Sequence, residues 1–328
     1  MLASGPNGAG KTNLLESLHV ATQGFSPRTR NDGNLARFGT ETFAVGVTGE
    51  SDRGNVTIDL RWRLGEGKHA RVNGTGVPSL ERLRVDTATL VFTPDRLAVV
   101  KAGPSVRRTY FDRVLSRLFP ARAGLPAEYA NALGQRNAAL RRVAAGQSSS
   151  ESIAPWSEQL TAAGAALAEA RDAALALLAP RFGEQAGELG LGEGRLEYEP
   201  SDVTADVLGA RLARDIERGL TGAGPHLDEF RILAGDRDLR AHGSQGEQRV
   251  AVLALLLAEA GLLAESHRVP PLLLLDDVLS ELDGDRRSAL VGRLRERGQV
   301  LVTAAARGAL PGDADQVLEV SPGRVRDA

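Results

Sequence analysis

The 328-residue sequence predicts an α/β fold in which a mixed sheet is interrupted by an inserted α-helical lobe. Three observations lead to this prediction. A glycine-rich loop near the amino terminus precedes a helix, and a run of four leucines near the carboxyl terminus ends in two aspartates. Between them, strand-like alternation gives way to a long helical stretch rich in Ala, Leu and Arg.

The first element is the loop GPNGAGKT, which satisfies the pattern G-x-x-x-x-G-K-[ST] of a phosphate-binding P-loop. Its residues are the candidate nucleotide ligands: Gly5, Pro6, Asn7, Gly8, Ala9, Gly10, Lys11 and Thr12. We expect Lys11 to reach the β- and γ-phosphates and the Thr12 hydroxyl to ligate Mg²⁺, at the positive end of the helix that follows. An ordinary glycine-rich turn is the alternative, but such turns seldom carry Lys-Thr, and the chain has only three lysines.

Alternating apolar residues follow between Thr42 and Val77 and indicate antiparallel strands, with Asn73-Gly74 as a hairpin turn. One more strand is expected in ATLVFTPD. We assign residues 1–103 to the first part of the ATPase lobe, 104–222 to the α-helical lobe and 223–328 to the return to the ATPase lobe. Within the helical lobe, Pro180 should break or kink the helix that begins near Trp156. Strands return in FRIL and DLRAH.

The run Leu272–Leu275 reads as a strand buried on both faces of a parallel sheet. Asp276 and Asp277 follow at its carboxyl end, where open α/β sheets bind ligands. Beside a P-loop, we expect Asp276 to hold the Mg²⁺ shell and Asp277 to polarise the attacking water, with Lys11 as the second catalytic residue. For Asp277, a helix-capping role is the alternative.

The segment HGSQGEQRV places Ser244 three residues before Glu247, which is a capping box at the start of a strongly apolar helix. Together with the two other motifs, Ser244, Gln245 and Gly246 stand where ATP-binding-cassette proteins carry their signature sequence. We therefore predict a P-loop NTPase of the ABC-ATPase type, in which this helix start grips a γ-phosphate presented by another subunit.

Basic residues are concentrated between Lys101 and Ala145, with nine basic side chains against two acidic ones. Such density is typical of a DNA-backbone contact, and the leading candidates are Arg107, Arg108, Arg141 and Arg142. The alternative is that these arginines only solvate the outer faces of helices.

The composition of the chain excludes several classes of site and of protein. The chain has no cysteine, which excludes disulfides, thiolate zinc sites and thiol catalysis. It shows neither a signal peptide nor an apolar run of membrane-spanning length. We expect a soluble, cytoplasmic protein without a membrane partner.

Taken in order, the motifs resemble those of the RecF family over nearly the whole chain. The segments that carry the resemblance are GPNGAGKTNLLESL, VNGTGV, VFTPDRLAVVKAGPSVRRTYFD, YANALGQRNAAL, PWSEQLTAAGAALAEAR, GAGPHLDEF, GSQGEQRVAVLALLLAEA and LLLLDDVLSELD. The resemblance implies an ATP- and Mg²⁺-dependent homodimer that binds single-stranded, gapped and duplex DNA. It also implies partnership with RecR and RecO in loading RecA, slow DNA-stimulated ATP hydrolysis, and a role for Asp283 across the dimer interface.

The sequence departs from the family pattern at several points. The family opens with two strands, about 25 residues, whose loss would expose a sheet edge, whereas this P-loop begins four residues after Met1. We expect either an upstream start or a shortened copy. Leu227 and Glu229 replace the Arg and Asp of the family motif, and the polar switch position after VLVT rests on Thr303 alone.

Three functions are therefore compatible with the sequence. The first is an ATP-gated, DNA-binding recombination mediator with slow hydrolysis. The second is a generic ABC-type ATPase of another machine, such as a transporter or defence nuclease. The third is a non-hydrolysing or truncated remnant that acts as a DNA- or partner-binding module.

Overall fold

The computed structural model describes residues 1–51, 54–80, 83–84, 88–267 and 269–328. The chain folds into two compact units, one made of Met1–Arg96 with Leu263–Ala328 and the other of Leu97–Leu262. The first unit therefore contains the P-loop and the two aspartates after the leucine run, and the second contains the signature segment.

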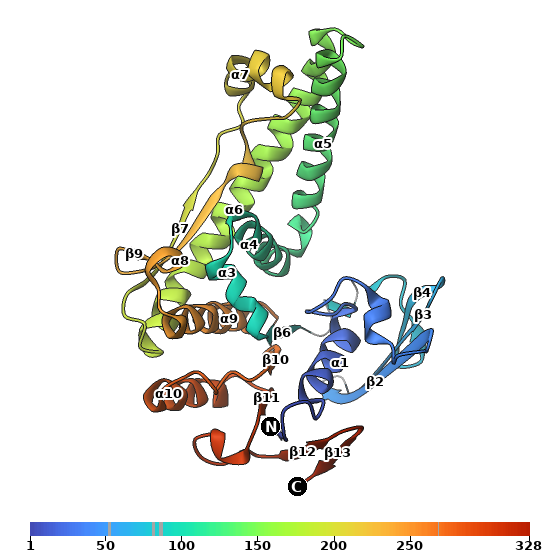
Figure 1. Ribbon diagram of the computed structural model, residues 1–328, viewed down its shortest axis with the longest axis vertical. Helices are drawn as coiled ribbons and strands as arrows, with labels where there is room; N and C mark the ends of the chain where they lie inside the picture. Colours follow the sequence, from blue (N-terminus) through green and yellow to red (C-terminus); the bar gives the residue numbers. More distant parts are fainter. Residues whose placement is uncertain (52–53, 81–82, 85–87, 268) are drawn as a thin grey trace. The chain divides into compact units, whose positions relative to one another are not determined.

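The first unit is built on a six-stranded sheet in the order β13-β12-β1-β11-β10-β6 (Figure 1). Its strands are β1 (Leu2–Ser4), β6 (Thr89–Phe92), β10 (Leu272–Leu275), β11 (Val300–Ala304), β12 (Val317–Ser321) and β13 (Arg324–Asp327). All neighbours pair in parallel except β12 and β13, which form an antiparallel hairpin. β10 is almost fully buried, as expected for a strand in the interior of a parallel sheet. The carboxyl ends of β1, β10 and β11 consequently meet at one edge.

A second sheet of the first unit is antiparallel and has the order β2-β3-β4-β5. It comprises β2 (Thr42–Ser51), β3 (Gly54–Arg63), β4 (Gly67–Val72) and β5 (Thr75–Gly76). The β4–β5 turn has positive φ at both Asn73 and Gly74, which is the type I′ geometry that this dipeptide favours. Helix α1 (Lys11–Gln23) packs Leu15 into the core of the first sheet and Val20 into the core of the second. The helix therefore joins the two sheets, while α10 (Gly284–Arg295) follows β10.

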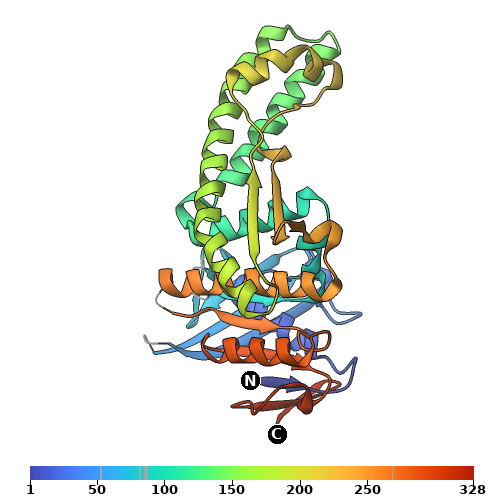
Figure 2. The ribbon, with the colours of Figure 1, turned by 90° about the vertical axis from the view of Figure 1, so that its left-hand side faces the viewer.

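The second unit is mainly helical. Its elements are α3 (Ala98–Lys101), α4 (Pro104–Leu118), α5 (Leu125–Ala144), α6 (Ala154–Glu188), β7 (Gly194–Glu199), α7 (Ala205–Arg218), β8 (Glu229–Ala234), β9 (Arg237–Asp238), α8 (Leu239–His242) and α9 (Gln245–His267), the last of which runs on past Leu262. Figure 2 shows β7 and β8 running alongside α6. Leu160, Leu167 and Leu208 lie in the core between the helices.

Several features of this unit differ from the sequence-based expectation. Pro180 does not end the helix, because Leu178 and Phe182 on either side of it are fully buried and hold α6 in register over 35 residues. Sequence reasoning missed β7 because it is short and lies within a stretch of helical composition. In DLRAH, residues Leu239–His242 form a helix rather than a strand, capped by Asp238.

The predicted boundary at residue 223 also differs from the observed division. β8 pairs antiparallel with β7, so residues 223–262 fold with the helical unit rather than with the ATPase sheet. No helix in the part of the chain that the structure describes is both long and apolar enough to cross a lipid bilayer.

Candidate nucleotide site and signature segment

The P-loop residues Gly5–Gly10 connect β1 to α1 and take a conformation that only small residues allow. Gly8 and Gly10 have φ of 81° and 104°, in the left-handed region that favours glycine. A Cβ on Gly5 would lie 2.2 Å from the carbonyl oxygen of Val320, so β12 approaches the loop too closely for any side chain. No side chain caps the Gly10 end of α1. The first-turn N–H groups of this helix are consequently suited to an anion.

The Lys11 side chain curls back over the loop that precedes it. Its Nζ donates hydrogen bonds to the carbonyl oxygens of Gly5, at 2.6 Å, and Pro6, at 3.0 Å. The ammonium group is thereby held above the backbone cradle, where the phosphates of a nucleotide would lie.

The predicted metal residues Thr12 and Asp276 meet although 264 positions separate them in sequence. Thr12 Oγ1 donates to the Asp276 carboxylate at 2.9 Å from Oδ2 and 3.1 Å from Oδ1. Asp276 is only 6% exposed and also accepts a hydrogen bond from Thr303 Oγ1 at 2.7 Å. The sheet order brings these groups together, because β1, β11 and β10 are neighbours and end at the same edge.

Asp277 is exposed, and its backbone has φ of 47°, one of two positive values among the described non-glycine residues. Its N–H donates to Thr303 Oγ1 at 2.9 Å, and its carboxylate accepts from Ser280 Oγ at 3.0 Å. Asp tolerates the left-handed region better than most residues, yet such outliers concentrate at functional sites. Asp283 caps α10 by accepting from the Arg286 N–H, and its side chain remains largely exposed.

The signature segment forms the reciprocal capping box predicted from its sequence. Glu247 N–H donates to Ser244 Oγ at 3.2 Å, and Ser244 N–H donates to Glu247 Oε2 at 2.8 Å. The Arg237 guanidinium, hydrogen-bonded to Glu247, and the Ser244 N–H lower the pKa of that carboxyl to about 2. Ser244 and Gln245 are exposed and Gly246 is half-buried, so the start of α9 is rigid and accessible. This segment belongs to the second unit and the P-loop to the first.

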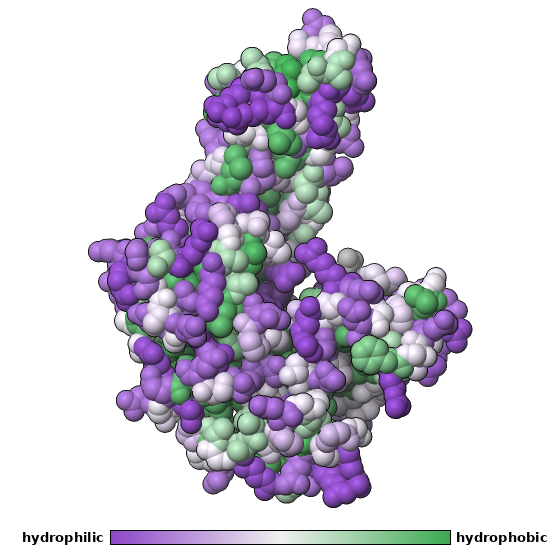
Figure 3. Space-filling view, viewed as in Figure 1, coloured by the Kyte–Doolittle hydropathy of each residue, from purple (hydrophilic) through white to green (hydrophobic). Residues whose placement is uncertain are grey.

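The four candidate DNA-binding arginines divide into two pairs. Arg107 is 4% exposed and ion-paired to Glu229, so it does not present a free cation at the surface. Arg108 donates to the backbone oxygen of Asp228 and is half-buried. Arg141 and Arg142, at the end of α5, are exposed, and strongly hydrophilic side chains gather over that end and over α7 (Figure 3).

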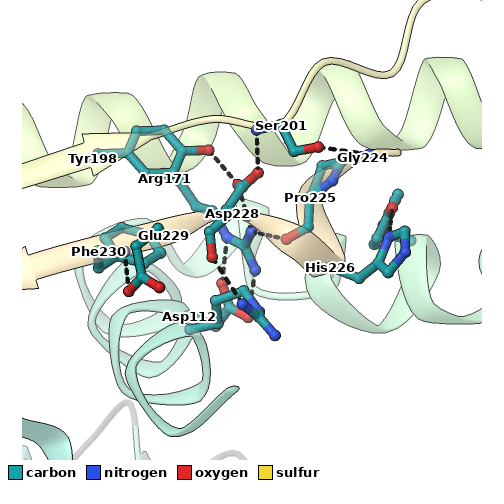
Figure 4. A network of polar contacts seen from close by, with 12 residues as sticks. Asp112, Arg171, Tyr198, Ser201, Gly224, Pro225, His226, Asp228, Glu229 and Phe230 are labelled. Carbon is teal, nitrogen blue, oxygen red and sulfur yellow. Dashed lines mark hydrogen bonds and ion pairs between the residues drawn. The ribbon is translucent and has the colours of Figure 1, made fainter. Parts of the chain in front are cut away.

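Sequence reasoning missed the buried polar network around Asp228 (Figure 4). At its centre Asp228, with no exposed surface, accepts from Arg171 at 2.7 Å, Tyr198 at 2.5 Å and the Ser201 N–H at 2.7 Å. Arg171 in turn makes a two-point contact with Asp112 of α4. One sequence clue is Arg171, which lies in a stretch of α6 rich in Ala and Leu.

Known proteins are similar to this chain in both sequence and fold. Residues 2–109 match the AAA domain family. The DNA replication and repair protein RecF of Heliobacterium modesticaldum is 34% identical over 91% of this chain and 84% of its own length. RecF of Anaeromyxobacter sp. strain K is 40% identical over 88% of this chain and 82% of its own length. This chain belongs to the RecF family.

Solved structures agree with that membership. The structure described as the recombination mediator protein RecF-ATP in the RecFOR pathway superimposes with a TM-score of 0.87 at 27% identity, covering 100% of this chain and 91% of that one. An SMC head bound to the C-winged helix domain of ScpA gives a TM-score of 0.58 at 16% identity, covering 100% of this chain and 88% of that chain, which shows a shared fold. The predicted P-loop ATPase fold and RecF resemblance are both confirmed.

Proposed function

We propose that this RecF-family chain is an ATP-dependent DNA-binding protein of recombinational repair and replication restart. It binds single-stranded, gapped and duplex DNA as an ATP-induced homodimer, and it assists RecA loading with RecR and RecO. It hydrolyses ATP slowly. The observation that carries the proposal is the meeting of Thr12 and Asp276 beside a P-loop, in a chain that superimposes on a RecF protein described with ATP.

The oxygen atoms of Thr12 and Asp276 fit a magnesium ion. Mg²⁺ prefers hard oxygen ligands and usually keeps only one or two protein contacts, completing its shell with phosphate oxygens and water. The described residues accordingly hold no cluster of three His, Cys, Asp or Glu side chains that would form an all-protein cage. Mg²⁺ would supply charge neutralisation at the β- and γ-phosphates.

The remaining chemistry is assigned to this chain's own groups. The N–H groups of residues 8–12 and the Lys11 ammonium hold the phosphates, while Asp277, on its fixed backbone, orients the attacking water. In the dimer, Ser244, Gln245 and Gly246 of a second copy hold the γ-phosphate at the positive end of α9, with the N–H groups of Gln245 and Gly246 as the donors, and Asp283 acts across the interface.

Hydrolysis is tested with Asp277→Asn, which keeps the shape of the side chain and removes its charge. ATP turnover should fall by at least about tenfold while ATP affinity is retained, since the residue acts on water rather than on binding. Unchanged turnover would remove Asp277 from the mechanism, whereas absent turnover in the wild type would favour a non-hydrolysing module.

DNA contact is assigned to Arg141 and Arg142, the two candidates that the structure leaves exposed. Each phosphate neutralised on duplex DNA contributes about −0.9 to the slope of log affinity against log salt. Charge reversal of both residues should therefore flatten that slope by about 1.8 per subunit if each contacts one phosphate. The matched control reverses Arg324 and Arg326, two exposed arginines of β13 in the other unit. Equal effects of the two double variants would contradict the assignment.

A further inference from the structure

Thr303 occupies the centre of the candidate site in the six-stranded sheet. It lies on β11, the strand between β1 and β10, and its side chain has no exposed surface. The register pairs Ala3 with Thr303 and Leu275 with Val302, which places Thr303 next to the first residue after β10. That residue is Asp276.

The Thr303 hydroxyl donates its hydrogen bond to Asp276. A hydroxyl has one proton to donate, and here Oγ1 donates to Asp276 Oδ1 at 2.7 Å. The same oxygen accepts the Asp277 N–H at 2.9 Å. The family pattern makes Thr303 the candidate for the polar switch position after VLVT, but here its one proton is donated to a carboxylate.

The two contacts act on consecutive residues with different proposed tasks. The first orients the Asp276 carboxylate, whose oxygens also accept from Thr12 Oγ1. The second holds the peptide of Asp277, where φ is 47°. One buried hydroxyl thus restrains the side chain of the metal residue and the backbone of the water-orienting residue.

We propose that Thr303 is the positioning residue of this site: it aims Asp276 at the metal and fixes the left-handed backbone that presents Asp277. The proposal rests on the proposed function for its consequence in nucleotide binding. Outer-shell partners of metal-binding carboxylates typically change metal affinity or activity about 10- to 100-fold when removed. The same range is expected here.

The test compares Thr303→Val, which keeps the shape and removes the hydroxyl, with Thr303→Ser, which keeps the hydroxyl. Binding of a fluorescent ATP analogue is titrated with Mg²⁺ and repeated in EDTA. The Val variant should need about 10- to 100-fold more Mg²⁺ for half-saturation, with unchanged affinity in EDTA, and the Ser variant should behave as the wild type. Thr303→Ala serves as the removal variant should Val not fold.

Three results would overturn the proposal. The first is an unchanged Mg²⁺ requirement in Thr303→Val, and the second is an equal defect in Thr303→Ser. The third is a Thr303→Val variant that no longer discriminates ATP from ADP but keeps its Mg²⁺ requirement, which is the behaviour of a phosphate sensor. Crystal structures of the nucleotide-free variants separate this proposal from the proposed function. Even if the wild type bound no Mg-ATP, a turned Asp276 carboxylate and a relaxed Asp277 backbone in Val would support the positioning role, and unchanged geometry in Val would refute it.

Discussion

Replacing Arg171 with Leu should destabilise the second unit strongly. Arg171 is 4% exposed and ties α6 to Asp112 of α4 and to Asp228, which has no exposed surface. Without the guanidinium, Asp228 keeps the Tyr198 hydroxyl and the Ser201 N–H but loses the cation with which it is ion-paired. Removing one member of a buried ion pair typically costs about 3–5 kcal/mol, because the other charge stays buried.

The assay uses the two tryptophans, one in each unit. Trp62 lies in β3 of the first unit and Trp156 in α6 of the second, so in a Trp62→Phe background the fluorescence of Trp156 reports urea unfolding of the second unit alone. The matched control is Arg122→Leu, which breaks a pair with Glu169 whose side chains are 43% and 73% exposed. That control should cost at most about 1 kcal/mol.

The double variant Arg171→Leu/Asp228→Asn should recover part of the loss, since it removes the stranded charge together with its partner. Two results would refute a buried, stranded charge as the cause. The first is an Arg171→Leu variant that loses no more stability than Arg122→Leu. The second is a double variant that is less stable than Arg171→Leu by the amount expected of a second, independent defect.

Two further predictions concern single groups. Burial lowers the pKa of His226, whose Nε2 donates to the Thr221 carbonyl while Nδ1 accepts from Tyr129. Because the unfolded state then binds protons more readily, the unfolding free energy of the second unit should fall as pH drops below about 6.5. His226→Gln should lose that dependence. If the unfolding free energies of His226→Gln and the wild type fell in parallel with pH, this prediction would be refuted. Ser244→Ala removes the hydroxyl that caps α9 and should lower the free energy of urea unfolding by about 1 kcal/mol. An unchanged unfolding free energy would contradict the capping role.

The sequence predicts those parts of the molecule that depend on neighbours along the chain. The P-loop, the buried strand before Asp276 and the capping box at Ser244 each follow from a short pattern whose physics is local. The meeting of Thr12 with Asp276 also follows in part, because parallel strands end at one edge of a sheet.

The remaining features depend on tertiary packing. Pro180 is tolerated because its neighbours are anchored in the core, and the exposure of an arginine depends on which acids the fold brings near it. Arg107 and Arg141 look alike in sequence, yet one pairs with Glu229, 122 positions away, and the other lies on the surface. No local pattern separates them, just as none reveals the hydrogen bond from Thr303 to Asp276.

ATP-gated assembly is tested most directly by sedimentation velocity of the 328-residue chain with and without Mg-ATP, beside a Lys11→Met control. The proposed function requires the P-loop of one copy to bind ATP before the Ser244 segment of another can grip it. We expect a shift from monomer to dimer only with Mg-ATP, and only in the chain that retains Lys11. A wild-type chain that binds Mg-ATP and stays monomeric, or a dimer that forms equally in the Lys11→Met variant, would contradict ATP-gated assembly.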